Sequence, residues 1–160
     1  YYTVPTTTAL NVNTIFSVTA WVFIQSPLTE DKEIFMRSNG SGGNEFNFAI
    51  EDSGVMAVHI DGTRYETTPT IPLNQWVHLA GVRNGATIRL FINGVLNTTG
   101  SPGGKTMNFG SCTTLLLGSD TDSGCTSSIE NHWRGRLDEV RIYDIALTDA
   151  QVASLANGNP

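Results

Sequence analysis

Lysine is scarce in this chain of 160 residues, and acidic residues outnumber basic ones. Lys32 and Lys105 are the only lysines, the arginines are scattered, and the formal net charge is −6. Binding to nucleic acid needs a basic face that meets the phosphates. This composition therefore excludes nucleic acid as a partner.

Long apolar runs and a signal peptide are also missing. No stretch is apolar for long enough to span a bilayer, so we expect no insertion into a membrane. The chain opens on the strand-like sequence YYTVP, without a charged and apolar leader. We therefore expect a processed or excised part of a longer, multidomain chain.

Cysteine is nearly absent, and a segment rich in Gly, Ser, Asp and Thr separates Cys112 from Cys125. A zinc site would need further Cys or His ligands at short spacing, and a redox site would need a C-x-x-C motif. Neither pattern is present, which leaves a disulfide or two free buried thiols. We expect the disulfide, and with it an extracellular setting, either secreted or at the surface of a cell or particle.

The abundant residues point to a β protein with many turns. Charged residues make up 15% of the chain, against about 25% in an average soluble domain, and there are 16 glycines. The length suits a single domain over residues 1–160, which can bury a substantial core.

Residues 72–96 contain the clearest strand signal in the chain. Four residues fall on one face of an extended segment, and three more resume the alternation after a turn at Asn84-Gly85. A second turn signal follows at Asn93-Gly94. The alternating residues are Trp76, His78, Ala80 and Val82, then Ile88, Leu90 and Ile92. This pattern predicts a β-hairpin of two central strands.

Much of the remaining chain alternates in the same manner. The alternation predicts strands at residues 16–24, 34–36, 46–50, 56–60, 114–118 and 137–143, and an edge strand or long connection at 63–71. Loops are expected at 97–106 and over the polar, acidic segment 119–131. Many strands separated by frequent turns predict an all-β fold, an antiparallel β-sandwich.

One helix is predicted, close to the C-terminus. Thr148 can cap it, and Gln151 stands three residues later, where it completes a capping box. Val152 and Leu155 would face the core, and Gly158 would end the helix. We expect this short helix to pack on a sheet edge.

Five segments, spread over nearly the whole chain, together resemble a known family. They are FSVTAWV, GVMAVHIDG, LNQWVHLAGVRNGATIRLFINGVL, LLLGS and RGRLDEVRIYDIALTDAQVASL. In combination they resemble the laminin G-like domains of the concanavalin A-like lectin and glucanase group, which are also similar to pentraxins.

The resemblance implies an antiparallel jelly roll of two curved sheets. It also implies a non-catalytic module of a secreted or surface protein that attaches to glycans or proteins. Members of the family carry a further N-terminal segment with an aromatic strand, and this segment is missing here.

Catalysis finds little support in the sequence. Glycosidases of this architecture use a pair of carboxylates on one strand face, typically spaced as E-x-D-x-E, and the chain has no such run. Asp138 and Glu139 are adjacent, so a regular strand would point them to opposite faces, and Glu45 stands alone. No Ser or Cys nucleophile stands beside a base either. We therefore expect no enzymatic activity.

Sugar binding calls for an exposed aromatic ring flanked by polar groups, because the apolar face of a sugar stacks on the ring. The sequence offers two candidate groups for this task. They are Trp133 with His132 and Asn131, after the polar loop, and Tyr65 with Arg64 and His59, on the connecting face of the meander.

The other tryptophans lie in alternating apolar strands, where structural roles are more common than binding. We expect Trp21 and Trp76 to lie in the core. We likewise expect His78 to be a hydrogen-bonded residue on the inner face of a sheet.

Calcium is the cofactor that the sequence favours, in a structural role. Asp138 shares a strand face with Val140 and Ile142, where an unpaired carboxylate would be costly. The resemblance implies that an aspartate at this place helps to hold Ca²⁺. The predicted ligands are Asp138, with Asp120, Asp122 and Glu130 of the acidic loop as further oxygen donors. An ion pair of Asp138 with Arg136 or Arg141 is the alternative.

These observations predict a carbohydrate-binding or adhesion module whose partner is a polysaccharide, a glycan or a protein. The alternative is a structural or protein-interaction β-sandwich without a sugar site. A hydrolase has the weakest support.

Overall fold

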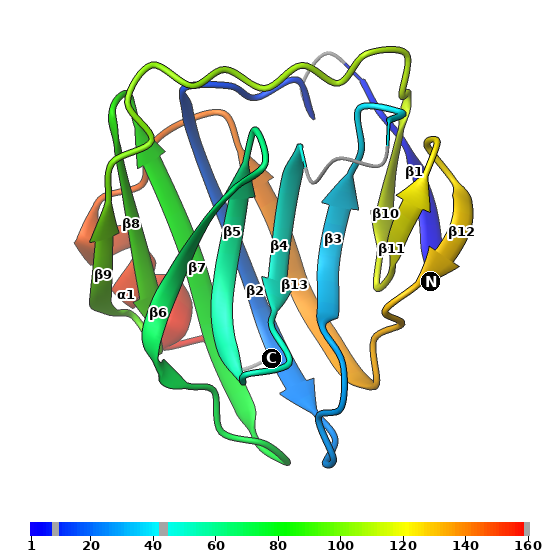
Figure 1. Cartoon of the computed structure of the whole chain (residues 1–160). Coiled ribbons are helices and arrows are strands. Elements are labelled where there is room, and N and C mark those ends of the chain that lie inside the picture. Colours follow the sequence, from blue (N-terminus) through cyan, green and yellow to red (C-terminus); the bar gives the residue numbers. More distant parts are fainter. Residues whose placement is uncertain (8–9, 42–44, 159–160) are drawn as a thin grey trace.

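A computed structural model describes residues 1–7, 10–41 and 45–158 of the chain, with residues 122 and 123 described by their backbone alone. Within these ranges the chain folds into two antiparallel sheets packed face to face, a small hairpin and one helix (Figure 1). The strands are β1 (Tyr2–Pro5), β2 (Ile15–Ile24), β3 (Lys32–Arg37), β4 (Phe46–Ile50), β5 (Val55–Ile60), β6 (Thr63–Thr70), β7 (Trp76–Asn84), β8 (Thr87–Ile92), β9 (Val95–Gly100), β10 (Thr114–Leu117), β11 (Asp120–Ser123), β12 (Ser127–Glu130) and β13 (Gly135–Tyr143), and the helix is α1 (Asp149–Ala156).

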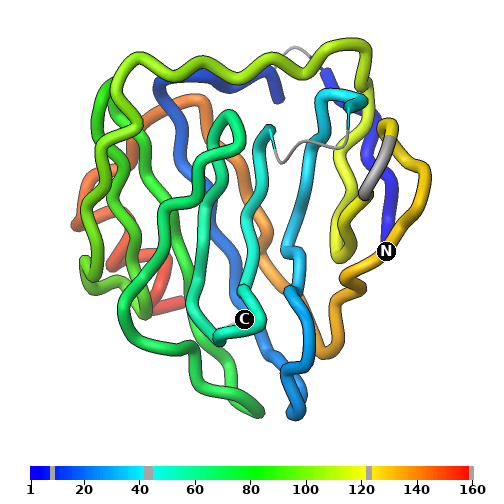
Figure 2. The backbone as a smooth tube through the Cα atoms, viewed as in Figure 1, coloured from blue at the N-terminus to red at the C-terminus, as the bar shows by residue number. Residues whose placement is uncertain are grey.

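Strands of the two sheets are interleaved in the sequence, so the chain crosses several times from one sheet to the other. The first sheet has the order β1-β10-β3-β4-β5-β6, and the second has the order β13-β2-β7-β8-β9. Between β9 and β10 the chain crosses one end of the sandwich (Figure 2). This arrangement confirms the predicted antiparallel sandwich, and its two layers and strand order are those of a jelly roll.

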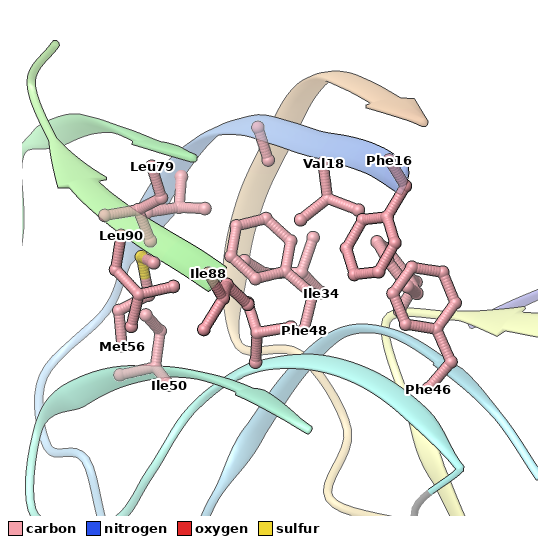
Figure 3. Packing of buried hydrophobic residues seen from close by; sticks show 14 of the residues in the cluster. Phe16, Val18, Ile34, Phe46, Phe48, Ile50, Met56, Leu79, Ile88 and Leu90 are labelled. Carbon is pink, nitrogen blue, oxygen red and sulfur yellow. The ribbon is translucent and has the colours of Figure 1, made fainter. Parts of the chain in front are cut away.

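Alternating residues from both sheets fill the space between the layers (Figure 3). Phe46 is in contact with the rings of Phe16 and Phe35, whose centroids each lie 5.0 Å from its own in an edge-to-face arrangement. The core residues contributed by β2 of the second sheet and by β4 and β5 of the first sheet are Phe16, Val18, Ala20, Val22, Ile24, Phe46, Phe48, Ile50, Met56, Val58 and Ile60. Burying aromatic and aliphatic side chains of this size supplies the main favourable term for folding.

Gly81 lies where the two sheets approach each other closely. A Cβ atom at this position would lie 2.8 Å from Cγ2 of Val58 and 3.2 Å from Cγ2 of Val18. The interior face of β7 therefore has no room for a side chain at this point.

Two expectations about the chain's path were wrong. The segment after Leu96, expected to be a loop, continues as β9, which pairs with β8 through Thr98 and Thr99. The segment 119–131, expected to be irregular, contains the β11–β12 hairpin. The strands β9, β11 and β12 are rich in polar residues and lack apolar alternation, which is the signal that the strand prediction used. The segment 63–71 does form an edge strand, β6.

The helix prediction was correct in its capping. The Thr148 side chain accepts a hydrogen bond from the backbone N–H of Gln151, and the Gln151 side chain accepts one from the backbone N–H of Thr148. Val152 is buried, with Leu155 packed beside it. The helix lies on the outer face of the second sheet, over Ala80, Val82 and Phe91, and so covers more than the expected edge.

Cys112 and Cys125 form the predicted disulfide, with an S–S distance of 2.05 Å. The bond ties the segment before β10 to the turn of the β11–β12 hairpin. It therefore fixes the hairpin to the first sheet.

The two tryptophans expected in the core lie outside it. Val22, Ile24 and Val77 point into the sandwich, so Trp21 and Trp76 point to the outer face of the second sheet, where both are half-buried. Both faces of β2 carry apolar residues, which made the inward face ambiguous in the sequence. Phenylalanine and aliphatic residues fill the interior instead.

Asp138 also lies elsewhere than expected. A β-bulge interrupts the pairing of β13 with β2 between Asp138 and Arg141, and Glu139 adopts a left-handed conformation with φ of 51°. The extra residue turns Val140 and Ile142 toward the core and leaves Asp138 exposed. Its Oδ1 accepts a hydrogen bond from the backbone N–H of Glu139. Asp138 therefore needs no buried counter-charge.

Candidate functional site

An aromatic groove lies at the free edge of the first sheet, beside β1 and the start of β13. Its cavity has a volume of about 260 Å³. The residues that line this aromatic groove are Tyr1, Tyr2, Leu117, Gly118, His132, Trp133, Gly135 and Leu137. Two of the predicted sugar-binding residues, His132 and Trp133, are among them, and Asn131 immediately precedes them in the chain.

Pairing of distant segments builds the aromatic groove. Tyr2 of β1 stands opposite Leu117 of β10 in the first sheet. The backbone N–H of Trp133 donates a hydrogen bond of 2.9 Å to the carbonyl of Gly118, which fixes the tryptophan next to β10. The ring of Tyr1 is stacked on the ring of His132, with the centroids 5.8 Å apart.

The groove combines two exposed tyrosines with a tryptophan whose side chain is partly buried. Tyr1 is 61% exposed and Tyr2 is 74% exposed. Trp133 is partly buried against the core, and its Nε1 has no hydrogen-bond partner within the described part of the chain. Exposed rings of this kind can stack on an apolar ligand face, while their polar tips can form hydrogen bonds.

The second predicted sugar-binding group does not form one surface. Tyr65 packs against the core between the sheets, whereas Arg64 and His59 lie on the opposite face of the first sheet. His59 Nε2 lies 3.0 Å from Oε1 of Glu51, and Arg64 donates a hydrogen bond of 2.8 Å to Oε2 of Glu51. The alternation of residues along β6 separates Tyr65 from Arg64.

Glu51 explains why His59 and Arg64 are held in place. Burial raises the pKa of the Glu51 carboxyl, but the hydrogen bonds and charges of His59 and Arg64 outweigh burial and leave the pKa below its ordinary value. The Glu51 carboxylate is therefore paired with both His59 and Arg64.

Two buried acidic residues, Glu33 of β3 and Asp120 of β11, form an acidic group between β3 and the β11–β12 hairpin. Glu33 is 3% exposed, and burial raises the pKa of its carboxyl well above 4.5, with a further contribution from the charge of Asp120. The Asn47 amide lowers this pKa in part, which places it beside Glu33. Oε2 of Glu33 and both polar side-chain atoms of Asn47 lack hydrogen bonds of good geometry within the described residues.

The predicted calcium ligands fall into two places. Asp120 is buried beside Glu33, and Glu130 stands opposite Asp120 in the hairpin. Asp138 belongs to the other sheet, and the side chain of Asp122 lies outside the described residues. Among the side chains that the structure describes, no three Asp, Glu, His or Cys residues gather in a way that could hold a metal ion.

A further cavity, the helix-side pocket, lies on the outer face of the second sheet, beside the C-terminal end of α1. It has a volume of about 240 Å³. The residues that line this helix-side pocket are Thr19, Trp21, His78, Glu139, Arg141, Ser154, Leu155 and Gly158. His78, expected on an inner face and hydrogen-bonded, is thus on an outer face, and its Nδ1 has no partner among the described residues.

Comparison with known families decides where this fold belongs. A family model described as the concanavalin A-like lectin/glucanases superfamily matches residues 1–153. The chain belongs to the concanavalin A-like lectin/glucanase superfamily. The resemblance noted in the sequence is therefore confirmed.

Solved structures in this superfamily's fold are similar over most of the chain. The SAP-like pentraxin of Limulus polyphemus has 19% identity and a TM-score of 0.68, covering 96% of this chain and 79% of that one. The Ruminococcus gnavus IT-sialidase CBM40 bound to α2,3-sialyllactose has 14% identity and a TM-score of 0.74, covering 92% and 85%. Domain 4 of AbnA, an extracellular arabinanase of Geobacillus stearothermophilus in complex with arabinotriose, has 24% identity and a TM-score of 0.66, covering 93% and 69%.

A comparison with curated protein sequences found no match. In the part of the chain that the structure describes, no helix has the length and apolar character needed to cross a membrane.

Sequence reasoning missed several of the residues that line these cavities. Tyr1 and Tyr2 were not predicted to bind, because their neighbours in the groove come from β10 and from the start of β13. The two adjacent tyrosines, Tyr1 and Tyr2, are nevertheless a sequence signal that could have been used. Trp21 was missed because it lies in an alternating apolar strand and was therefore expected in the core.

Proposed function

We propose that this superfamily member is a non-catalytic carbohydrate-binding module and that the aromatic groove holds the glycan. The observation that carries the proposal is the set of aromatic side chains at the groove, with Tyr1 and Tyr2 exposed beside His132 and Trp133. Two solved domains of similar fold, the R. gnavus CBM40 and domain 4 of the G. stearothermophilus arabinanase, are described in complex with sugars. The Cys112–Cys125 disulfide supports an extracellular location, secreted or at a surface. The module would belong to a longer chain.

Binding would depend on stacking and on the polar tips of the rings. Tyr2, at 74% exposure, can lay its ring against the apolar face of a sugar without moving any part of the core. The cavity of about 260 Å³ is smaller than a typical pocket for a drug-sized ligand, so one sugar ring would enter it. The neighbouring rings of a chain would lie along the free edge of β1, where Tyr2 is exposed.

Affinity gel electrophoresis on a panel of polysaccharides tests the proposal. We expect at least one polysaccharide to retard the native chain, and Tyr2→Ala to weaken binding about five- to tenfold, since a stacked ring contributes about 1–1.5 kcal/mol. Val95→Ala is the matched control, because Val95 is 69% exposed on β9 at the far edge of the other sheet. Trp133→Ala should also weaken binding.

If no polysaccharide retards the native chain, the proposal is contradicted. It would favour the alternative function, a structural or protein-binding sandwich without a sugar site. Equal retardation of Tyr2→Ala and the native chain would show that the glycan binds outside the groove.

We also propose a structural Ca²⁺ ion at the acidic group of Glu33 and Asp120, as the calcium prediction suggested for Asp120. The unpaired Oε2 of Glu33 and Oδ1 of Asn47 support it, because buried oxygens without hydrogen bonds are what a hard cation would satisfy. Binding would release the Glu33 proton, and the positive charge would then neutralise the carboxylates of Glu33 and Asp120. Calorimetric titration of chelator-treated protein with Ca²⁺ tests this proposal. If Ca²⁺ gives no binding heat and does not raise the melting temperature, the proposal is wrong.

A further inference from the structure

The helix-side pocket is formed by strands from one sheet and by the end of α1. Thr19 and Trp21 lie on the outer face of β2, and Trp21 stands opposite His78 of β7. The bulge in β13 places Glu139 and Arg141 at the rim. The remaining wall is Ser154, Leu155 and Gly158, at the C-terminal end of the helix.

His78 brings a ring nitrogen without a hydrogen-bond partner among the described residues to the wall of this pocket. Its side chain is nine-tenths or more buried, and Nδ1 has no hydrogen-bond partner among the described residues. Burial, assisted by the positive charge of Arg141, lowers the pKa of His78 to about 4. The imidazole is therefore neutral at pH 7, and it has one donor and one acceptor nitrogen.

Glu139 and Arg141 form an ion pair at the rim of the pocket, and their side chains are 42% and 44% exposed. The pair presents charged acceptors and charged donors side by side. Two adjacent hydroxyl groups can donate to the carboxylate and accept from the guanidinium at the same time. The carboxylate also neutralises the guanidinium, so an anionic ligand would gain little from this rim.

The aromatic surface and the size of the cavity complete the set of features. Trp21 is half-buried, with its ring edge-to-face against His78 at a centroid distance of 5.4 Å, and it lines the pocket. A volume of about 240 Å³ lies below the usual range for drug-sized ligands. The pocket therefore suits a compact ring with one apolar face and several hydroxyl groups.

We propose that the helix-side pocket is a second ligand site, which binds a single neutral sugar ring on Trp21, His78 and the Glu139–Arg141 pair. The site does not rest on the aromatic groove. The groove lies at the edge of β1 and uses Tyr1 and Tyr2, whereas this pocket lies on the outer face of β2 and β7.

Nuclear magnetic resonance separates the two sites, because the three tryptophans give three indole N–H signals. We would titrate the ¹⁵N-labelled chain with the methyl glycosides of galactose, glucose, mannose, xylose and arabinose, and with sialic acid as an acidic comparison. At least one neutral glycoside should shift the Trp21 signal in a saturable manner. Trp133 reports on the aromatic groove, and Trp76 lines neither cavity.

Rim variants keep the test independent of folding. Arg141→Ala removes exposed donors and should weaken the titration followed at Trp21 by about tenfold or more, because a charged hydrogen bond contributes about 1.5–3 kcal/mol. Arg136→Ala, an exposed arginine of the same strand that lines neither cavity, is the matched control and should leave the affinity unchanged. Tyr2→Ala should also leave it unchanged, even though that variant weakens binding in the groove.

The proposal is overturned if no neutral glycoside shifts the Trp21 signal, or if Arg141→Ala and Arg136→Ala bind equally well. Saturable binding by sialic acid alone would overturn it too, because the site would then be selective for an acid. If a glycoside shifts the Trp21 signal but not the Trp133 signal, this result contradicts binding in the aromatic groove and not binding in the helix-side pocket.

Discussion

Replacing Glu33 with glutamine is expected to stabilise the chain at pH 7, in the absence of Ca²⁺. The Glu33 side chain is 3% exposed, and burial, with the charge of Asp120, raises the pKa of its carboxyl well above the ordinary value of 4.5. Glutamine keeps nearly the same shape but has no proton to lose. The Glu33→Gln variant therefore removes the cost of keeping this carboxyl protonated in the native state.

The sign of the pH dependence follows from proton binding. Above about pH 4.5 the unfolded chain loses the Glu33 proton, while the native state retains it until the pH passes the higher folded pKa. Native stability is thus full below the unfolded pKa and falls by about 1.4 kcal/mol per pH unit through that window. The gain from Glu33→Gln at pH 7 cannot exceed about 3.4 kcal/mol, which is the free energy of holding one proton 2.5 pH units above a pKa of 4.5.

Urea denaturation with chelator, at several values between about pH 4.5 and pH 7.5, measures this free energy. The difference between Glu33→Gln and the native chain should grow as the pH rises. Glu66→Gln is the matched control, because it makes the same substitution at an exposed position of β6.

One outcome would refute the reasoning. If Glu33→Gln is less stable than the native chain by the same amount at every pH, Glu33 is ionised and held by a favourable partner. Repeating the series with Ca²⁺ tests the calcium proposal separately. The ion should stabilise the native chain but not the variant, and more strongly at higher pH, since binding must release the Glu33 proton.

Two further perturbations test the fold. The double variant Cys112→Ser and Cys125→Ser should lower the free energy of unfolding by about 3 kcal/mol, because the bond closes a loop with a sequence separation of 13, and an unchanged urea midpoint would contradict this. Gly81→Ala should cost about 1–3 kcal/mol through overpacking against Val58, whereas Gly104→Ala, where a Cβ meets nothing within 4 Å, should cost far less in the same thermal melts.

The sequence was sufficient to predict the sandwich because alternation is strong in the strands that face the core. Phe46, Phe48 and Ile50 show it, as do Met56 and Val58. The capping box of α1 could also be predicted from the sequence, because Thr148 and Gln151 interact within one helical turn. Both features depend on neighbours in the sequence.

The errors occurred where distant or irregular structure decides the outcome. The bulge at Glu139 cannot be seen in LDEVRIY, whose alternation reads as a regular strand, so Asp138 was placed on the wrong face. Trp21 was placed inside because both faces of its strand are apolar. The aromatic groove depends on Tyr2 meeting Leu117, which no local pattern indicates.

The short first strand has a consequence for how the protein can be trimmed or cleaved. Residues Tyr2–Pro5 pair with Thr114–Leu117, so they shield the backbone edge of a leucine-rich strand. Removing the first five residues would expose that edge as a template on which another chain could add a strand, and self-association would follow. Any shortened version of this domain should therefore keep its first residues, so that the edge of β10 stays paired.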